Sequence, residues 1–148
     1  MPSVAIVTSG SAGTGREVAR ELATWGWAIV VVYLEDQPRA EATASEILAA
    51  DGTAVTVRAD LADDLDVARL FAESIAVFGG VDVLVHTTTD PSSLLYHHAA
   101  RLVRAGGAIV TVSTAEPFAS GVARHLQERG IKVGRAPPEE ILPFLEGL

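Results

Sequence analysis

Short apolar runs alternate with amphipathic segments along this chain, and this alternation limits the possible folds more than any other feature. The apolar or β-branched runs cover residues 4–8, 28–33, 53–57, 81–85, 108–112 and 131–133. Continuous apolar runs are typical of strands buried on both faces, as in parallel sheets. Between them, apolar residues recur three or four positions apart, which indicates helices. The pattern predicts an α/β fold with helices on both faces of a parallel sheet, joined by right-handed crossovers.

Turn residues indicate where the helices end. Asp51-Gly52 follows the helix expected over residues 38–50, and Gly79-Gly80 follows the next one. We expect Gly106-Gly107 to close a helix over residues 94–104. Further helices are expected over residues 118–129 and in a short segment around residues 141–145.

Length and composition exclude several classes of protein. The 148 residues predict a single domain over 1–148, and 49% hydrophobic with 20% charged residues is typical of a globular chain. A net charge of −8 argues against nucleic-acid binding, and the absence of cysteine excludes disulfides and thiolate chemistry. The longest apolar stretch, residues 25–34, is too short to span a membrane. With no signal peptide in view, we expect a cytoplasmic protein, and ten arginines to one lysine are typical of GC-rich bacterial coding.

A glycine-rich turn lies between the first strand and the first helix. It reads Ser9-Gly10-Ser11-Ala12-Gly13-Thr14-Gly15. Backbone N–H groups at such a helix N-terminus can hold a pyrophosphate, and glycines allow it to approach. The alternative is a tight turn whose glycines serve only strand–helix packing.

Later segments follow this turn in a familiar order. Asp60-Leu61 follows the third strand, residues 81–85 follow a Gly-Gly pair, and residues 107–114 and 126–133 complete the order. In this order, the segments resemble the short-chain dehydrogenase/reductase family over most of the chain. The resemblance implies a reduced Rossmann-type, doubly wound parallel sheet of about six strands in the order 3-2-1-4-5-6. The cofactor-binding residues that it implies are Ser9, Gly10, Ser11, Gly13, Gly15, Tyr33, Asp60, Leu61, Thr87 and Thr88.

The chain departs from this family where its chemistry is carried out. In the family's TGxxxGxG turn, Ser9 replaces the first glycine, and the family's NNAG is replaced by residues 86–89, His-Thr-Thr-Thr. The segment with the active-site asparagine is absent, and so is YxxxK. Lys132 is the only lysine and is far in sequence from Tyr33 and Tyr96. The chain therefore resembles a member shortened by two internal losses, in which only the serine position survives, as Thr114.

Acidic residues follow the second strand, where the family selects its cofactor. Glu35 and Asp36 occupy the place where NAD-type members carry an acid, so we expect NAD to be favoured over NADP if either binds. Residues 35–66 hold nine acids and two arginines. We interpret this segment as a solvated rim, because none of these acids has the spacing of metal ligands. His97 and His98 are adjacent on a helix and should point apart, so no metal site is predicted.

His86 is the most prominent candidate for chemistry. It ends the fourth strand at the carboxyl edge, where open α/β sheets bind ligands. Asp90 lies four residues on, and Thr114 ends the neighbouring strand. Such a set can transfer protons, so His86, Asp90 and Thr114 are candidate catalytic residues. The alternative is a strand-end histidine that is hydrogen-bonded to the backbone and has no catalytic part.

Two helices correspond to the family's usual oligomer interface, over residues 94–104 and 118–129. Apolar residues on more than one side of the first helix predict a homodimer or a heteromer. We expect a small molecule at the carboxyl edge of the sheet. The leading hypothesis is a degenerate family member that binds a small molecule or a subunit, without ordinary carbonyl reduction. The alternatives are a cofactor-independent lyase, isomerase or cyclase that uses His86 and Asp90, and an atypical NAD-dependent oxidoreductase.

Overall fold

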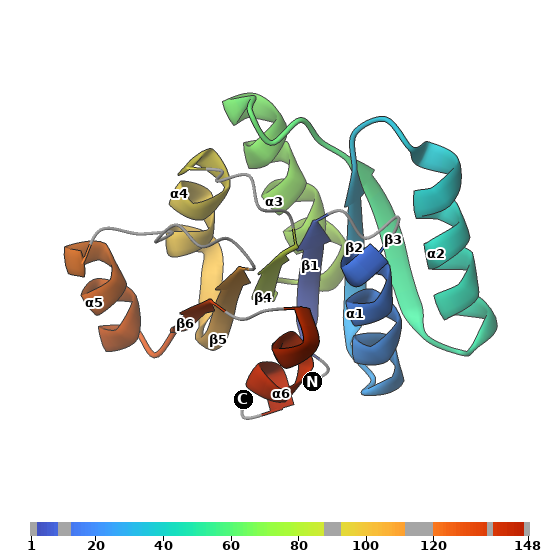
Figure 1. Ribbon diagram of the computed structural model, residues 1–148. Coiled ribbons are helices and arrows are strands. Elements are labelled where there is room, and N and C mark those ends of the chain that lie inside the picture. Colours follow the sequence, from blue (N-terminus) through green and yellow to red (C-terminus); the bar gives the residue numbers. More distant parts are fainter. Residues whose placement is uncertain (1–2, 9–12, 88–92, 112–119, 136–137, 147–148) are drawn as a thin grey trace.

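Six parallel strands form one sheet in the order β3-β2-β1-β4-β5-β6, which confirms the predicted fold class and strand order (Figure 1). The computed structural model describes residues 3–8, 13–87, 93–111, 120–135 and 138–146. The strands are β1 (Val4–Thr8), β2 (Ala28–Tyr33), β3 (Thr53–Arg58), β4 (Val81–His86), β5 (Val103–Thr111) and β6 (Lys132–Arg135). The helices are α1 (Gly13–Thr24), α2 (Gln37–Ala49), α3 (Asp64–Phe78), α4 (Ser93–Leu102), α5 (Ser120–Glu128) and α6 (Ile141–Glu146), the last preceded by a 3-10 turn, η1 (Pro138–Glu140).

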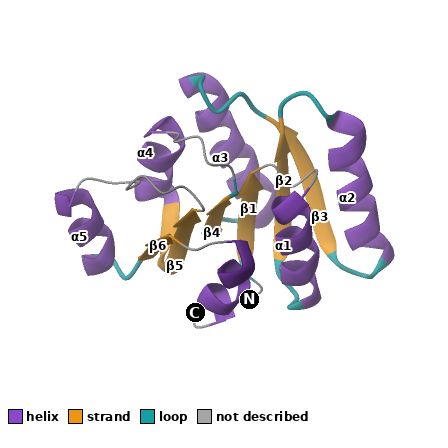
Figure 2. Ribbon diagram, in the orientation of Figure 1, coloured by secondary structure: helices purple, strands orange, loops and turns teal. Residues whose placement is uncertain are grey.

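Helices cover both faces of the sheet, as Figure 2 shows. Alternate residues of each strand point to opposite faces, so β1 sends Ala5 and Val7 to one core and Ile6 to the other. The first core is completed by α1, α2 and α6, and the second by α3, α4 and α5. Burial on both faces explains why the central strands β1 and β2 are almost continuously apolar.

The acidic stretch after β2 serves partly to start helices. Asp36 caps α2 and accepts a hydrogen bond from the backbone N–H of Arg39, at 3.4 Å. Asp63 caps α3 and accepts from the N–H groups of Leu65 and Asp66. Both carboxylates lie at the positive end of a helix dipole. These contacts fit the solvated rim that the sequence indicates.

One expected boundary is wrong. The sequence indicates a helix over residues 94–104 that Gly106-Gly107 closes, but α4 ends at Leu102 and β5 begins at the next residue. The two glycines lie inside β5, where its pairing with β4 shifts register between Val81 and Val83. Gly106 has a φ of +87°, and its N–H donates to the carbonyl of Gly130 at 2.8 Å. The glycine pair therefore shapes an irregular strand rather than ending a helix.

None of the helices within the described part of the chain is long and apolar enough to cross a membrane.

Candidate nucleotide-binding edge

The carboxyl ends of the strands meet along one edge of the sheet. The register places Thr8 of β1 beside the end of β2, and it pairs His86 of β4 with Thr111 of β5. The strand order reverses between β1 and β4, because β2 lies on one side of β1 and β4 on the other. Open α/β sheets bind ligands at such a point, outside the carboxyl ends of the strands.

Side chains link β1 to β4 at this edge. The Nδ1 atom of His86 lies 2.9 Å from the Oγ1 atom of Thr8. The backbone N–H of Thr87 donates to the same hydroxyl at 3.1 Å, and the Thr87 hydroxyl donates to the carbonyl of Thr8 at 2.7 Å. Three contacts therefore join the last residue of β1 to the end of β4.

A buried polar cluster continues from these contacts toward β5. His86 is 1% exposed, and its ring meets that of Tyr96 edge to face, with centroids 5.6 Å apart. Tyr96 comes from α4 and is 3% exposed, and Thr111 is fully buried. Burial raises the pKa of the Tyr96 phenol above its ordinary value of 10.0, and a hydrogen bond with the Thr111 side chain opposes this to a smaller extent. The cluster joins β1, β4, α4 and β5 through polar side chains shielded from water.

Only one member of the predicted catalytic set falls within the described residues. Asp90 and Thr114 lie outside them, so the structure does not place either carboxylate or hydroxyl. His86 is held by the Thr8 hydroxyl rather than by a backbone group alone, and it is enclosed on both sides. The acid–base role of His86, Asp90 and Thr114 stays a prediction.

The described part of the glycine-rich turn lies where α1 begins. Gly13 is the first residue of α1 and has a φ of +58°, a left-handed conformation that favours glycine. No heavy atom lies within 4 Å of where a Cβ on Gly13 would be, so space around its backbone is open. Gly15 is buried in the first turn. Ser9, Gly10, Ser11 and Thr88, which the resemblance also assigns to the cofactor, lie outside the described residues.

The ends of β2 and β3 carry the remaining predicted cofactor residues. Asp60 is used locally, because its Oδ1 accepts from the N–H of Ala62 at 2.9 Å and its own N–H donates to Asp66 at 2.9 Å. That donated hydrogen bond lowers the pKa of Asp66, with help from Arg69 and Arg58 and against partial burial. Tyr33 and Leu61 are both half-buried, so neither side chain is enclosed in the core.

The sequence analysis does not place one arginine, Arg58, at this edge. The register pairs Arg58 of β3 directly with Tyr33 of β2, so an exposed cation lies beside the end of β2, where the family selects its cofactor. The other arginine of residues 35–66, Arg39, forms an ion pair with Asp36 at 3.4 Å. Aligning the third strand against the second, residue by residue, would have placed Arg58 at the edge.

The single lysine lies away from this edge. Lys132 begins β6 and pairs in register with Ala108, three residues before Thr111 on β5. Its ammonium lies 4.3 Å from the ring centroid of Phe144 and 3.4 Å from the Phe144 carbonyl oxygen. It therefore lies toward the amino ends of the strands, on the side opposite Tyr96 and Tyr33.

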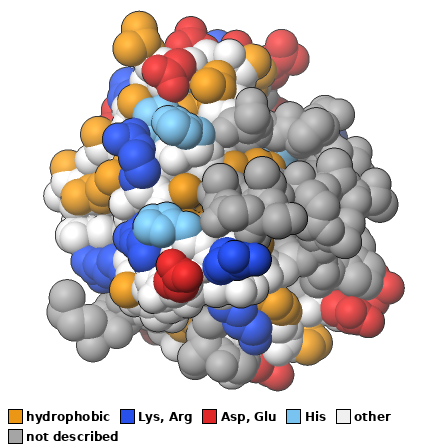
Figure 3. Space-filling model, turned by 90° about the vertical axis from the view of Figure 1, so that its left-hand side faces the viewer, with side chains coloured by type: hydrophobic (Ala, Val, Ile, Leu, Met, Phe, Trp, Pro, Cys, Tyr) orange, Lys and Arg blue, Asp and Glu red, His pale blue; other side chains and the backbone are white. Residues whose placement is uncertain are grey.

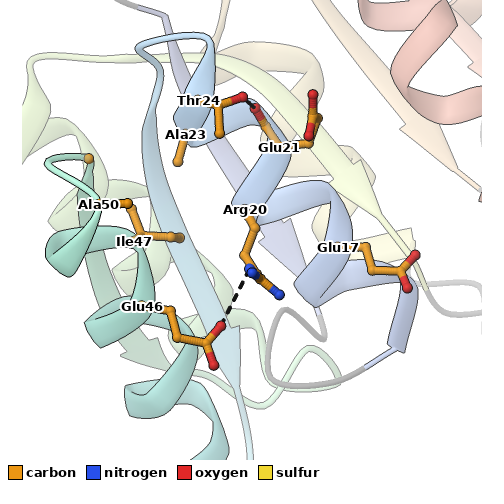
Figure 4. Close-up of a pocket in the computed structure, with 9 residues that line it drawn as sticks. Glu17, Arg20, Glu21, Ala23, Thr24, Glu46, Ile47 and Ala50 are labelled. Carbon is orange, nitrogen blue, oxygen red and sulfur yellow. Dashed lines mark hydrogen bonds and ion pairs between the residues drawn. The ribbon is translucent and has the colours of Figure 1, made fainter.

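Metal-ligating side chains and a pocket elsewhere in the structure are two other possible sites. No group of three metal-ligating side chains occurs in the ranges that the structure describes, and His98 is bound to Asp64 at 2.8 Å instead of sharing an ion with His97. A pocket of about 350 Å³ lies between the later turns of α1 and α2 (Figure 4). Its charged wall includes Arg20, whose Nε lies 3.4 Å from Glu46. The pocket is lined by residues 17–24 and 46–52, so it does not belong to the carboxyl edge.

Similarity to known proteins agrees with this architecture. A hydroxynaphthalene reductase-like protein of Metarhizium robertsii is 29% identical over 152 residues, which span 87% of this chain and 57% of the relative. A 3-oxoacyl-[acyl-carrier-protein] reductase of Staphylococcus aureus is 36% identical over 86 residues, 58% of this chain and 35% of the relative. The chain thus spans less than two thirds of the length of these relatives.

Solved structures match over more of the fold. A dehydrogenase/reductase from Sinorhizobium meliloti matches with a TM-score of 0.78 and 28% identity, over 91% of this chain and 71% of that one. A short-chain dehydrogenase from Burkholderia cenocepacia, in complex with NADP, matches with a TM-score of 0.78 and 26% identity, over 91% and 73%. Residues 3–95 match the short chain dehydrogenase family itself. With the strand order and the glycine-rich turn already described, the chain belongs to the short-chain dehydrogenase family.

Proposed function

We propose that this chain is a binding module with the family's nucleotide-binding fold, which takes a small molecule or a partner subunit and does not carry out ordinary carbonyl reduction. The position of Lys132 carries this proposal. A tyrosine acts as the acid in this family when a lysine lowers its pKa, and Lys132 is held by Phe144 at the other side of the sheet.

The chain's own tyrosines do not replace the missing pair. Tyr96 lies at the correct edge, but burial raises its pKa instead of lowering it, which makes it a poorer proton donor near neutral pH. General acid catalysis contributes roughly 10²–10⁴-fold to a rate, so its loss removes most of the reaction.

The first part of the fold supports binding of a dinucleotide. Gly13 and Gly15 start α1 at the point where the strand order reverses, as the pyrophosphate site requires. A solved neighbour from Burkholderia cenocepacia holds NADP. For this chain we propose NAD over NADP, because Glu35 and Asp36 follow β2 and would repel a 2′-phosphate, and Asp36 already neutralises Arg39. Arg58 is the residue that would favour the opposite choice.

Two measurements test the proposal. Isothermal titration calorimetry with NAD, NADH, NADP and NADPH should give tighter binding for the NAD pair than for the NADP pair. An Arg58→Gln variant should increase that preference, whereas Arg20→Gln, which changes the charge equally but lies in the pocket between α1 and α2, should leave it unaltered. Tighter binding of NADP would contradict the assigned preference, and binding of none of the four would restrict the module to another ligand.

The second measurement is enzymatic. NAD(P)H-dependent reduction of simple ketones and of acyl-thioester ketones should be below about one percent of that of a YxxxK relative, given the size of general-acid effects. A rate above that level would contradict the binding-module proposal and would favour the atypical oxidoreductase.

A further inference from the structure

Charge is distributed very unevenly along this acidic chain. Residues 93–135 contain six basic and two acidic residues, whereas the remainder contains five basic and seventeen acidic ones. The segment that forms α4, β5, α5 and β6 is therefore positive by four charges, and the rest of the chain is negative by twelve. A chain whose overall charge is −8 thus has one basic region.

Most arginines of the acidic region bind carboxylates, whereas those on α4 and α5 bind none that the structure describes. In the acidic region, Arg16 and Arg20 bind Glu46, Arg39 binds Asp36, and Arg69 binds Asp66 and Glu73. On α4 and α5, neither Arg101 nor Arg124 forms an ion pair with any carboxylate within the described ranges. The nearest acid on α5, Glu128, lies one turn after Arg124 without pairing with it. No described carboxylate binds either guanidinium directly, although Arg101 lies 3.2 Å from the Nδ1 atom of His98, whose other ring nitrogen lies 2.8 Å from Asp64.

The cations lie on one continuous surface. Both helices cover the same face of the sheet, and the guanidinium of Arg129, directly after α5, donates to the carbonyls of Ala100 in α4 and Val103 at the start of β5. The described apolar residues of α4 and α5 pack against the core, and Glu128 is the one exposed acid of these helices. Their exposed side chains also include His97, Arg101, Arg124 and His125. We call these four residues the basic face. In Figure 3, Lys, Arg and His side chains gather along the left and centre of the view, with one acidic group among them and others nearer the margin.

We propose that the basic face binds an acidic surface of a partner protein. The proposal rests on the subunit-binding part of the proposed function and names the chemistry of the subunit. A second copy of this chain, placed across a two-fold axis, would offer the same basic face and not the complementary charge. A nucleic acid would meet few cations on this face and the repulsion of twelve net negative charges elsewhere.

The test uses the full chain and two synthetic helical peptides, one with glutamates along one face and the other with glutamines in their place. Fluorescence anisotropy should show binding of the glutamate peptide that weakens as sodium chloride is raised, because exposed charges are screened. The glutamine peptide should bind at least about tenfold more weakly.

Variants locate the binding surface. The double variant Arg101→Gln, Arg124→Gln lowers the net charge by two and should weaken binding of the glutamate peptide by about tenfold. The matched control Leu48→Glu, Val77→Glu changes the net charge equally at two exposed positions on α2 and α3 and should alter binding less than about twofold. Circular dichroism checks that both double variants fold.

Several results would overturn the proposal. They are equal binding of both peptides, an equal effect of the control variant, or tighter binding of a random-sequence single-stranded DNA than of the glutamate peptide. A sedimentation experiment in which the chain dimerises and the Arg101, Arg124 double variant does not would assign the basic face to a second copy instead. Nucleotide calorimetry on the same samples separates these failures from failure of the proposed function, since none of the four mutated residues lies at the carboxyl edge.

Discussion

The two parts of this sheet differ in how regularly their strands pair. From β1 to β3 the strands pair without interruption, residue by residue, and the arginines of α1 and α2 bind carboxylates. From β4 onward, the pairing shifts register, α4 passes into β5 without a connecting residue, and Arg101 and Arg124 lack described acidic partners. The regular part falls within the segment that matches the family, residues 3–95, and that segment ends inside α4.

The two parts differ in the backbone that their strands require. β5 shifts its register against β4 over a stretch that includes two consecutive glycines. The pairing beside the glycine-rich turn is regular, whereas β5 is irregular before it reaches Thr111. The four predictions below examine this contrast by perturbing one part at a time.

The largest effect is expected at Gly107. A Cβ on Gly107 would lie 1.9 Å from the carbonyl oxygen of Asp82, which is backbone and cannot move aside. Gly107→Ala should therefore lower the free energy of unfolding by about 3 kcal/mol or more, as overpacking against a fixed backbone does. Urea unfolding followed by circular dichroism measures the change.

Neighbouring Gly106 is the control for this prediction. A Cβ there would meet nothing within 4 Å, so Gly106→Ala should cost only the left-handed strain, about 1–2 kcal/mol. Gly13→Ala in the regular part has the same open surroundings and should behave like Gly106→Ala. Equal losses at Gly106 and Gly107 would show that strain, rather than close approach of β4, shapes the irregular strand.

The next effect concerns the link between β1 and β4. His86→Ala removes a buried ring and its contact with the Thr8 hydroxyl, and should lower the free energy of unfolding by about 2–4 kcal/mol, mainly through the cavity that it leaves. Thr8→Val keeps the volume and should cost less, about 1–2 kcal/mol. A different outcome would support the acid–base alternative. In that outcome, His86→Ala and Asp90→Ala both fold with unchanged stability, yet neither complements a deletion of the gene in its host.

A smaller effect is expected where the strands begin. Asp82 accepts from the N–H of Val4 at 2.8 Å and lies 3.5 Å from Arg104, which ties the starts of β1, β4 and β5 together. Arg104→Met should cost about 1 kcal/mol, because the ion pair is partly exposed and the neighbouring Gly79 carbonyl also loses a donor. Arg39→Met on α2, whose ion pair with Asp36 is exposed, should cost less than half of that. Thermal unfolding with equal losses at both positions would contradict a special part for Arg104.

The smallest effect appears only in alkaline solution. Because burial raises the pKa of Tyr96 above 10.0, the unfolded chain gives up this proton before the folded chain does. The contribution of the buried, neutral Tyr96 phenol to the free energy of unfolding is fully present below pH 10, and it is lost as the pH rises through the higher pKa of the folded state. The unfolding free energy of Tyr96→Phe should therefore fall less steeply above pH 10 than that of the unaltered chain, and parallel curves would contradict this.

The sequence predicts the sheet well because uninterrupted apolar runs leave few other arrangements. It does not predict the start of β5, because a glycine pair reads equally as a helix end or as an irregular strand, and only the contact of Gly107 with Asp82 distinguishes them. At the site, the end of a strand identified His86, but Thr8 as its partner depends on which strands are neighbours. Arg58 was missed for the same reason, since its place beside Tyr33 is a matter of register. The sequence therefore identifies the type of each residue but does not predict which residues the pairing of strands brings together.

The last helix has a consequence for how the chain folds. Ile141 and Leu145 of α6 lie in the same core as Ala5 and Val18, so the first and last described elements share one apolar cluster (Figure 1). Completing that cluster closes a loop over nearly the whole chain, whose entropic cost must be met before the contacts form. We expect slow folding with a single cooperative transition, in which loosening α6 exposes β1 as well. Because α6 and β1 share this core, protease sensitivity at α6 would report the stability of the entire sheet.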